Sequence, residues 1–269
     1  MNRYALIFCG VIFLLLTALL TGCKCDDPTN PECPNYCVDE TNPECPNYNP
    51  CWDQTPVSAD FRIIENGSFA TTKVLDTVYF DTVRASNLIF EVLDEKPGQT
   101  YTWQIGAGVY DTPRVSLNFA QAPKFVPIEI KLMVQGTPNT NCFPEDTGTD
   151  TMVRKVVFTD KHRWIADYHG FLNGNPEDTI TLKIYPGDPF LVTQMYNFKR
   201  GCEDVLNQSA ITYRKLRFVG TSACDYPNGI LTWDPDKTGD RNKVRCEYTL
   251  DRRNEQPNIV KYIFEGRML

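Results

Sequence analysis

The sequence predicts an all-β protein, with a β-sandwich of two sheets followed by a small antiparallel β domain. Three observations support this fold class. After Pro56, apolar and polar residues alternate in short runs, as in strands with one buried face. Gly, Pro and Asn separate these runs at intervals typical of turns. Helical periodicity does not extend over any run of about twelve residues.

The first 22 residues are predicted to be a signal peptide. Arg3 precedes an apolar run, Tyr4 to Leu20, and small residues then lead into Cys23, as a cleavage site requires. The run LTGC resembles the lipobox of bacterial lipoproteins. This resemblance implies that Cys23 receives a diacylglycerol and acyl chains such as palmitate, and that the mature protein is exported. The alternative is a transmembrane anchor, for which about 17 apolar residues lie at the short limit.

The residues after the lipid cysteine bear on localisation. Lys24-Cys25-Asp26-Asp27 resembles the lysine-plus-acidic signal that directs Bacteroidota lipoproteins to the outer face of the outer membrane. The resemblance implies an outer-membrane lipoprotein. Cys25 interrupts the pattern, so both the cell surface and the periplasmic face stay open.

Residues 23–56 are predicted to form a cysteine- and proline-rich tether. The eight residues TNPECPNY occur at 29–36 and again, unchanged, at 41–48. Prolines recur every few residues and aliphatic side chains are almost absent, so neither a helix nor a sheet is expected. The segment therefore predicts an extended, stiffened spacer.

The chain has eleven cysteines, of which Cys9 leaves with the signal peptide and Cys23 is consumed by the lipid. In an exported protein the other nine predict disulfide bonds, whose pairing the sequence leaves open. The disulfide candidates are Cys33, Cys37, Cys45, Cys51, Cys202 and Cys224. A bond between Cys142 and Cys246 would require the two β domains to touch. Zinc is the alternative for the tether, but its cysteine spacings exceed the usual C-x2-C pairs and no histidine is nearby, so no metal is predicted.

Charge is distributed unevenly over the two β domains. The formal net charge is −7, yet residues 23–160 carry 10 basic and 20 acidic residues, and residues 161–269 carry 16 and 14. The change supports a domain boundary near residue 160. Neither half has a concentrated basic stripe, which argues against nucleic-acid binding.

Residues 57–160 are predicted to form an immunoglobulin-like sandwich of seven strands. The expected strands are 61–64, 77–80, 88–93, 101–105, 114–119, 128–134 and 152–158. In the run 128–134, alternation places Ile128, Ile130, Leu132 and Val134 on the buried face.

This segment also resembles a PKD domain, an extracellular β-sandwich module. The resemblance rests on the run YTWQIGAG at 101–108 and on the two strands that follow. Trp103, Gly106 and Gly108 match the Trp-Asp-Phe-Gly-Asp-Gly motif of that family, whereas Gln104 and Ala107 replace its acidic residues. The resemblance implies a spacer or binding module, with Trp103 as a buried plug between the sheets.

Residues 161–269 are predicted to form an up-and-down antiparallel β domain, either a closed lipocalin-like barrel or an open sandwich. The expected strands are 163–168, 179–185, 191–196, 211–218, 229–233, 243–250 and 259–264. The opening run Tyr168-His-Gly170 and the closing run Phe264-Glu-Gly266 resemble those of small lipocalin-like domains of exported lipoproteins.

One acidic turn in this domain resembles the start of an EF-hand calcium loop. Asp234, Asp236 and Asp240 supply oxygens at suitable positions with Gly239 at the sixth. Arg245 occupies position 12, where a bidentate acid is required, so a charged hairpin loop is the alternative reading. Calcium is therefore the one candidate ion, and no other cofactor is predicted.

Aromatic side chains give the better lead to a function. Four of them are predicted to line the mouth of the C-terminal β domain and contact a protein or carbohydrate. These binding candidates are Trp164, Tyr185, Tyr196 and Trp233. For each one, packing in the core is the alternative.

Catalysis has no support in the sequence. His162 and His169 would face opposite sides of a strand, and neither a G-x-S-x-G elbow nor a phosphate loop occurs. The predicted function is non-catalytic binding of an envelope protein or polysaccharide by a lipid-anchored protein. One alternative is a structural accessory subunit of an outer-membrane secretion, motility or uptake complex. Another is a small-molecule carrier or hydrolase that uses the C-terminal domain.

Overall fold

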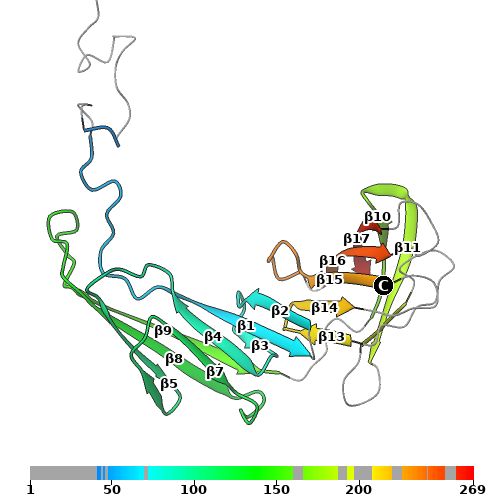
Figure 1. Cartoon of the computed structure of the whole chain (residues 1–269), viewed down its shortest axis with the longest axis horizontal. Coiled ribbons are helices and arrows are strands. Elements are labelled where there is room, and N and C mark those ends of the chain that lie inside the picture. Colours follow the sequence, from blue (N-terminus) through cyan, green and yellow to red (C-terminus); the bar gives the residue numbers. More distant parts are fainter. Residues whose placement is uncertain are drawn as a thin grey trace, which may run out of the picture. The chain divides into compact units, whose positions relative to one another are not determined.

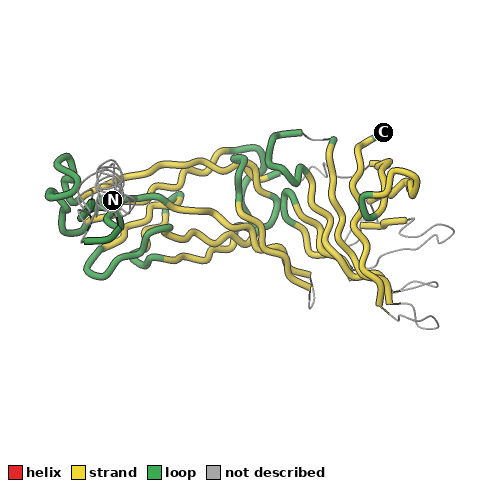
Figure 2. The backbone as a smooth tube through the Cα atoms, turned by 90° about the horizontal axis from the view of Figure 1, so that it is seen from above, coloured by secondary structure: helices red, strands yellow, loops and turns green. Residues whose placement is uncertain are grey.

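The computed structural model describes residues 41–43, 45, 48–69, 72–159, 166–186, 193–196, 208–219, 226–240, 242–251 and 259–269. These residues form strands and loops and include no helix, which confirms the all-β prediction (Figure 2). The chain divides into two compact units. One contains the chain up to Pro56 together with Asn139–Asp146, and the other contains Val57–Pro138 and Thr147–Leu269.

The second unit begins with a sandwich of two sheets (Figure 1). The strands are β1 (Phe61–Phe69), β2 (Thr72–Thr77), β3 (Thr82–Val83), β4 (Asn87–Val92), β5 (Thr100–Ile105), β6 (Gly108–Tyr110), β7 (Arg114–Asn118), β8 (Pro127–Gln135) and β9 (Thr149–Phe158). One sheet has the order β2-β1-β4-β7 and the other the order β3-β9-β8-β5-β6. All pairs are antiparallel except β3 with β9.

Alternation along the strands builds the sandwich core as predicted. Ile130, Leu132 and Val134 on β8 are fully buried. Trp103 on β5 is also fully buried, and its indole lies 5.1 Å edge-to-face from Phe61 on β1, in the other sheet. Its N–H donates a hydrogen bond to the Thr112 carbonyl at 2.8 Å, so burial leaves no polar group of the indole unpaired.

The sandwich differs from the predicted strands in the region of β2. Only the first residue of the expected strand 77–80 belongs to a strand, as the end of β2. Beyond it, Val78 packs into the sandwich core while Phe80 packs against the core of the following sheet. The short strands β3 and β6 were not predicted. The turn between β5 and β6 contains Gly106 at a φ of 57°, a conformation that suits a residue without a side chain.

The C-terminal strands form one eight-stranded antiparallel sheet. They are β10 (Ala166–Leu172), β11 (Asn175–Pro186), β12 (Thr193–Tyr196), β13 (Gln208–Ile211), β14 (Lys215–Val219), β15 (Tyr226–Trp233), β16 (Lys243–Asp251) and β17 (Ile259–Met268). The order is β12-β11-β10-β17-β16-β15-β14-β13. It is an up-and-down meander in which the first strand, β10, pairs with the last, β17. In the described part of the chain, β12 and β13 are the two ends of this order.

Close approach of β10 and β17 depends on two glycines. Gly170 lies directly opposite Gly266 in the register. A Cβ atom on Gly170 would overlap the Glu265 carbonyl, and one on Gly266 would overlap the Phe264 ring. Both glycines belong to the short runs that the sequence singled out at the start and end of this domain, and they are required by packing.

One predicted strand, 211–218, is two strands in the structure. Thr212, Tyr213 and Arg214 form a tight turn between β13 and β14, closed by the Thr212 N–H to the Lys215 carbonyl at 2.9 Å. Buried residues of β10, β11, β14, β15, β16 and β17 pack on one face and form the core of the sheet. The β-strand propensity of these residues favours one continuous strand. The break is explained by the contacts of Arg214 and Lys215 with Asp76.

Candidate functional site

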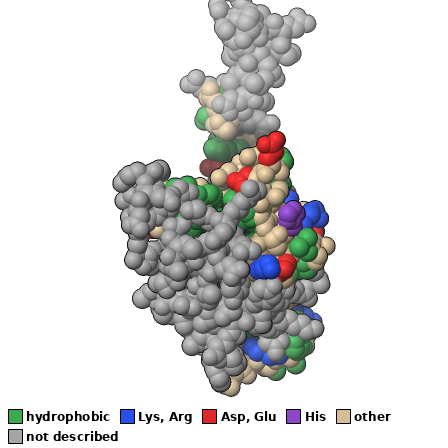
Figure 3. Space-filling model, turned by 90° about the vertical axis from the view of Figure 1, so that its right-hand side faces the viewer, with side chains coloured by type: hydrophobic (Ala, Val, Ile, Leu, Met, Phe, Trp, Pro, Cys, Tyr) green, Lys and Arg blue, Asp and Glu red, His purple; other side chains and the backbone are tan. Residues whose placement is uncertain are grey.

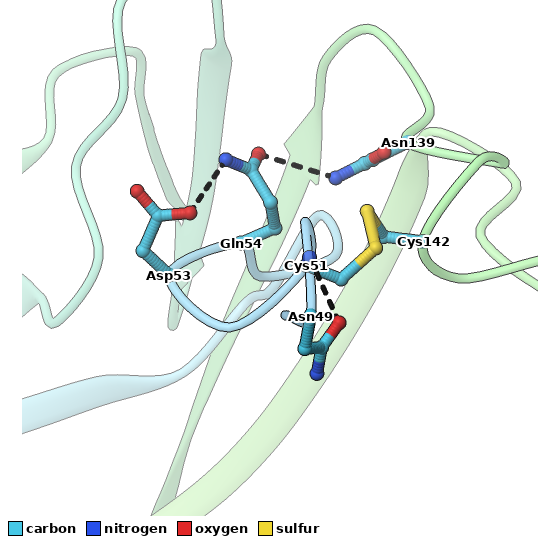
Figure 4. The surroundings of a disulfide bond; sticks show 6 residues. All are labelled: Asn49, Cys51, Asp53, Gln54, Asn139 and Cys142. Carbon is cyan, nitrogen blue, oxygen red and sulfur yellow. Dashed lines mark hydrogen bonds between the residues drawn. A yellow bond between two sulfur atoms is a disulfide. The ribbon is translucent and has the colours of Figure 1, made fainter. Parts of the chain in front are cut away.

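A disulfide bond between Cys51 and Cys142 ties the end of the tether to the loop between β8 and β9 (Figure 4). It joins residues 91 positions apart, with Cα atoms 5.4 Å apart. The Asn139 side chain donates a hydrogen bond to Gln54 at 3.4 Å, and Asn49 accepts the Cys51 N–H at 2.9 Å. These contacts hold the last tether residues and the loop together as one unit.

The disulfide candidates are placed as follows. Cys51 and Cys45 are both disulfide-bonded. Cys142 bonds Cys51 rather than Cys246, which is a free thiol in the core of the eight-stranded sheet. Burial raises the pKa of Cys246 well above its usual value, which makes the thiol unreactive. The lipidation candidate Cys23 and the candidates Cys33, Cys37, Cys202 and Cys224 lie outside the described residues.

Removing the Cys51–Cys142 bond is expected to expose the end of the tether to proteases. The double substitution Cys51→Ser and Cys142→Ser should cost about 2–4 kcal/mol of stability and speed cleavage within residues 48–56. Limited proteolysis of the full chain under non-reducing conditions, read by mass spectrometry, measures this. Cys246→Ala keeps the bond and is the control. Equal cleavage rates in the two variants would contradict the expected role of the bond.

The calcium candidates do not share a centre. Asp234 is fully buried, and its carboxylate accepts the N–H groups of Thr238 at 3.0 Å and Gly239 at 2.8 Å, so it shapes its own loop. Asp236 pairs with Lys243, and Asp240 pairs with Arg267 at 3.1 Å. No group of three or more His, Cys, Asp or Glu among the described residues is arranged to hold a metal ion.

The aromatic binding candidates are placed only in part. Trp233 lies in the core of the eight-stranded sheet, 2% exposed, and its ring is edge-to-face with Tyr213 at 5.6 Å. Trp233 therefore packs in the core instead of lining a binding surface, because its position on β15 is on the buried face. Trp164 and the side chains of Tyr185 and Tyr196 lie outside what the structure describes.

The opposite, outer face of the same sheet carries a shallow groove of about 680 Å³. Cross-strand neighbours line it, because His169 faces Arg267 and Phe171 faces Glu265 in the register of β10 and β17. Figure 3 shows a histidine with charged side chains beside it on one face of the molecule. We call this set the groove face. It consists of His169, Phe171, Thr179, Lys243, Glu265 and Arg267.

Charges on the groove face are balanced by exposed ion pairs. Arg245 contacts Glu265 at 3.1 Å, and Lys243 and Arg267 pair with acids of the 234–240 loop. A second groove of about 350 Å³ adjoins the first and shares Lys243 and Glu265 with it. Exposed pairs of this kind contribute at most about 1 kcal/mol each, so a charged partner can replace them at small cost.

A second candidate site is buried. The β1–β2 hairpin extends beyond β4 and packs against β13 and β14 (Figure 1). We call this contact between the hairpin and residues 212–215 the joint. Gly67 on β1 is required here, because a Cβ atom would overlap the backbone of Ile211 on β13. The joint connects the sandwich and the eight-stranded sheet within one compact unit.

Glu65 lies at the centre of the joint and is only 1% exposed. One carboxylate oxygen accepts the N–H groups of Arg84 at 2.6 Å and Ala85 at 2.8 Å, and the other accepts the Tyr213 N–H at 2.8 Å. The side chain therefore bridges both β domains. Burial raises the pKa of Glu65 to about 7 against the effect of these three donors, and the charge of Asp76 adds to the rise.

Asp76 lies directly opposite Glu65 on the hairpin and is also buried. Lys215 reaches it at 3.1 Å and the buried Arg214 at 3.9 Å. Arg214 also donates to the Asp234 carbonyl at 2.6 Å. Burial raises the pKa of Asp76, while the two cations oppose the rise. Arg214 lies in the turn that splits the predicted strand 211–218, and Lys215 is the first residue of β14 directly after it, so the contacts of both cations with Asp76 explain the turn.

Aromatic contacts extend the joint. The Tyr79 ring lies beneath the Arg214 guanidinium at 5.1 Å and the Lys237 ammonium at 4.1 Å. Such cation–π contacts contribute about 0.5–1 kcal/mol each at exposed sites. Phe80 follows and packs against the core of the eight-stranded sheet. The joint thus combines a buried ionic centre with an apolar anchor.

The sequence of β1 carries a signal for the joint. In β1 the alternation Phe61, Ile63, Glu65, Gly67 places a carboxylate and a glycine on the buried face. A charge at a buried position needs a partner, but the partners of Glu65 lie as far as 148 residues away. The pattern alone therefore indicated that a partner exists without identifying it.

The chemistry available at these two sites is recognition and proton binding. The groove face offers an apolar floor with charges of both signs. The joint offers paired carboxylates shielded from solvent, and these carboxylates bind protons more tightly than free ones do.

Helices that are long and apolar enough to cross a membrane do not occur in the described part of the chain. Comparisons of the chain with protein-family models, with curated proteins and with solved structures gave no match.

Proposed function

We propose that this chain is a lipid-anchored outer-membrane protein that displays a non-catalytic binding module. The lipobox-like run ending at Cys23 supports the anchor. The Cys51–Cys142 bond supports an oxidising compartment, where such bonds persist. The PKD-like sandwich serves as the spacer, and the eight-stranded sheet as the module. The observation that carries the proposal is the groove face, a continuous surface on the outer side of that sheet.

The partner is another protein of the cell envelope. Phe171 gives the groove an apolar floor, while Lys243, Glu265 and Arg267 supply charges of both signs. Protein interfaces use complementary charges to fix register and partner choice around an apolar centre. A polysaccharide is the competing ligand. Lipid anchoring raises the local concentration of the module at the membrane, so a modest affinity suffices.

Charge reversal on the groove face tests the proposal. Lys243→Glu combined with Arg267→Glu should lower partner recovery at least about tenfold after crosslinking on cells and purification of the full chain. Lys261→Glu, at a cation on β17 that is as exposed as Arg267 and does not line the groove, is the control and should leave recovery unchanged. Recovery that survives the double reversal would exclude the groove face as the binding surface.

Two further readouts separate the alternatives. Binding of the purified chain to a glycan array that is lost in the double reversal variant would assign the groove to a polysaccharide. A single partner recovered in equal amount from every preparation would favour an accessory subunit. Protease treatment of intact cells, with lysed cells as control, places residues 57–269 outside the cell if they are digested. Protection until lysis would place them in the periplasm.

A further inference from the structure

The buried carboxylates of the joint differ in how their charge is balanced. Asp76 has two cations within 3.9 Å, Lys215 and Arg214. Glu65 has three N–H donors, and among the described residues no cation forms an ion pair with it. It also faces the like charge of Asp76 across the hairpin. An ionised Glu65 is therefore the least compensated buried charge of the joint.

Each element that packs around Glu65 contributes to the balance of charge at its carboxylate. The β2 strand supplies Asp76, the turn after β13 supplies Arg214 and the start of β14 supplies Lys215, both cations being directed at Asp76. The segment between β3 and β4 supplies the N–H groups of Arg84 and Ala85. Asp234, in the β15–β16 loop, keeps its carboxylate on its own loop and offers only its carbonyl to Arg214.

We propose that the joint is a proton-operated latch. With a proton on Glu65, the hairpin is held firmly against residues 212–215. When the proton leaves, the joint contains two opposed carboxylates, and the hairpin detaches more readily from the eight-stranded sheet. The sandwich and the binding module are then less firmly coupled. This inference is independent of what the groove face binds.

The direction of the effect follows from linkage. Burial raises the pKa of Glu65 from 4.5 to about 7, so the closed joint binds the proton more tightly than an open, hydrated one. The contribution of the Glu65 proton to the stability of the closed joint is fully present below pH 4.5, declines as the pH rises and is lost above pH 7. The raised pKa of Asp76 acts in the same direction, starting from its usual value of 3.8.

Hydrogen exchange of the full chain tests the latch. We compare exchange at pH 5.5 and pH 8 in the peptide covering residues 208–219, after correction for the intrinsic base-catalysed rate. The two pKa values give a rise of about 30-fold in the opening equilibrium between these conditions. The peptide covering β8 in the sandwich is the internal control and should show no corrected rise.

Two substitutions separate the latch from general pH sensitivity. Glu65→Gln should remove most of the pH-dependent rise at 208–219 and leave only the part due to Asp76, whereas Glu129→Gln, an exposed carboxylate on β8, should leave the whole rise intact. Asp76→Asn should move the midpoint to lower pH, because it removes the like charge that faces Glu65 across the hairpin. If Glu65→Gln does not fold, the midpoint of Asp76→Asn decides.

Three results would overturn the latch. One is a corrected exchange rate at 208–219 that does not change with pH in the unaltered chain. Another is an equal rise in the β8 peptide, which would show global opening. The third is an unchanged midpoint in Asp76→Asn.

Discussion

Replacing Arg214 with methionine is expected to lower the free energy of unfolding by about 3–5 kcal/mol. The guanidinium is almost fully buried and holds three partners together: the Asp76 carboxylate, the Asp234 carbonyl and the Tyr79 ring. Methionine fills a similar volume but leaves a buried carboxylate and a buried carbonyl with fewer partners. Urea denaturation of the full chain at pH 7 measures the loss.

The control for this substitution is Arg217→Met, on the adjacent strand β14, where the side chain is half-buried. Its expected cost is below about 1 kcal/mol. The double substitution Arg214→Met with Asp76→Asn should recover part of the loss, since it removes the stranded charge. Equal small costs for Arg214→Met and Arg217→Met would show that the ionic centre does not hold the joint.

Truncating Trp103 to alanine should cost about 3–5 kcal/mol, because it empties the centre of the sandwich. The indole lies between the two sheets, against Phe61 and Phe90, and its N–H bonds the Thr112 carbonyl. Differential scanning calorimetry should show a lower melting temperature, with loss of the near-ultraviolet circular dichroism of the buried ring.

Two variants calibrate the Trp103 result. Trp103→Phe retains most of the buried ring and loses the hydrogen bond, so it should cost about 1–2 kcal/mol. Gln104→Ala, at the exposed neighbouring position on β5, should be within about 0.5 kcal/mol of the unaltered chain. A cost for Trp103→Ala no larger than for Gln104→Ala would show that the ring is not the plug between the sheets.

Local alternation was enough to predict the fold class and much of the sandwich. The predicted buried face of 128–134 is the observed one. Successive side chains of a strand point to opposite faces, so when one face lies in the core the apolar residues mark that face directly. The antiparallel meander of the C-terminal sheet followed from the same pattern. The pairing of the first strand, β10, with the last, β17, was left open between a closed barrel and an open sandwich, since local alternation does not identify strand partners that are distant in sequence.

The misplaced elements share one physical cause. The strand 211–218 was expected to be continuous, and 77–80 was expected to be a strand, because both are apolar and alternate. Each is redirected by a contact with the other β domain: Arg214 and Lys215 bind Asp76, and Phe80 packs into the second core. Tertiary contacts of this kind override local preference. The Cys142 bond to the tether is a further long-range constraint that spacing could not supply.

The hairpin that forms the joint also protects the molecule from self-association. A strand at the end of a sheet presents free backbone groups to which another chain can add. In this sheet β13 is one of the two terminal strands in the described order. The β1–β2 hairpin packs against it, with Gly67 close to the backbone of Ile211. Folding of the sandwich therefore shields a strand that would otherwise invite edge-to-edge aggregation.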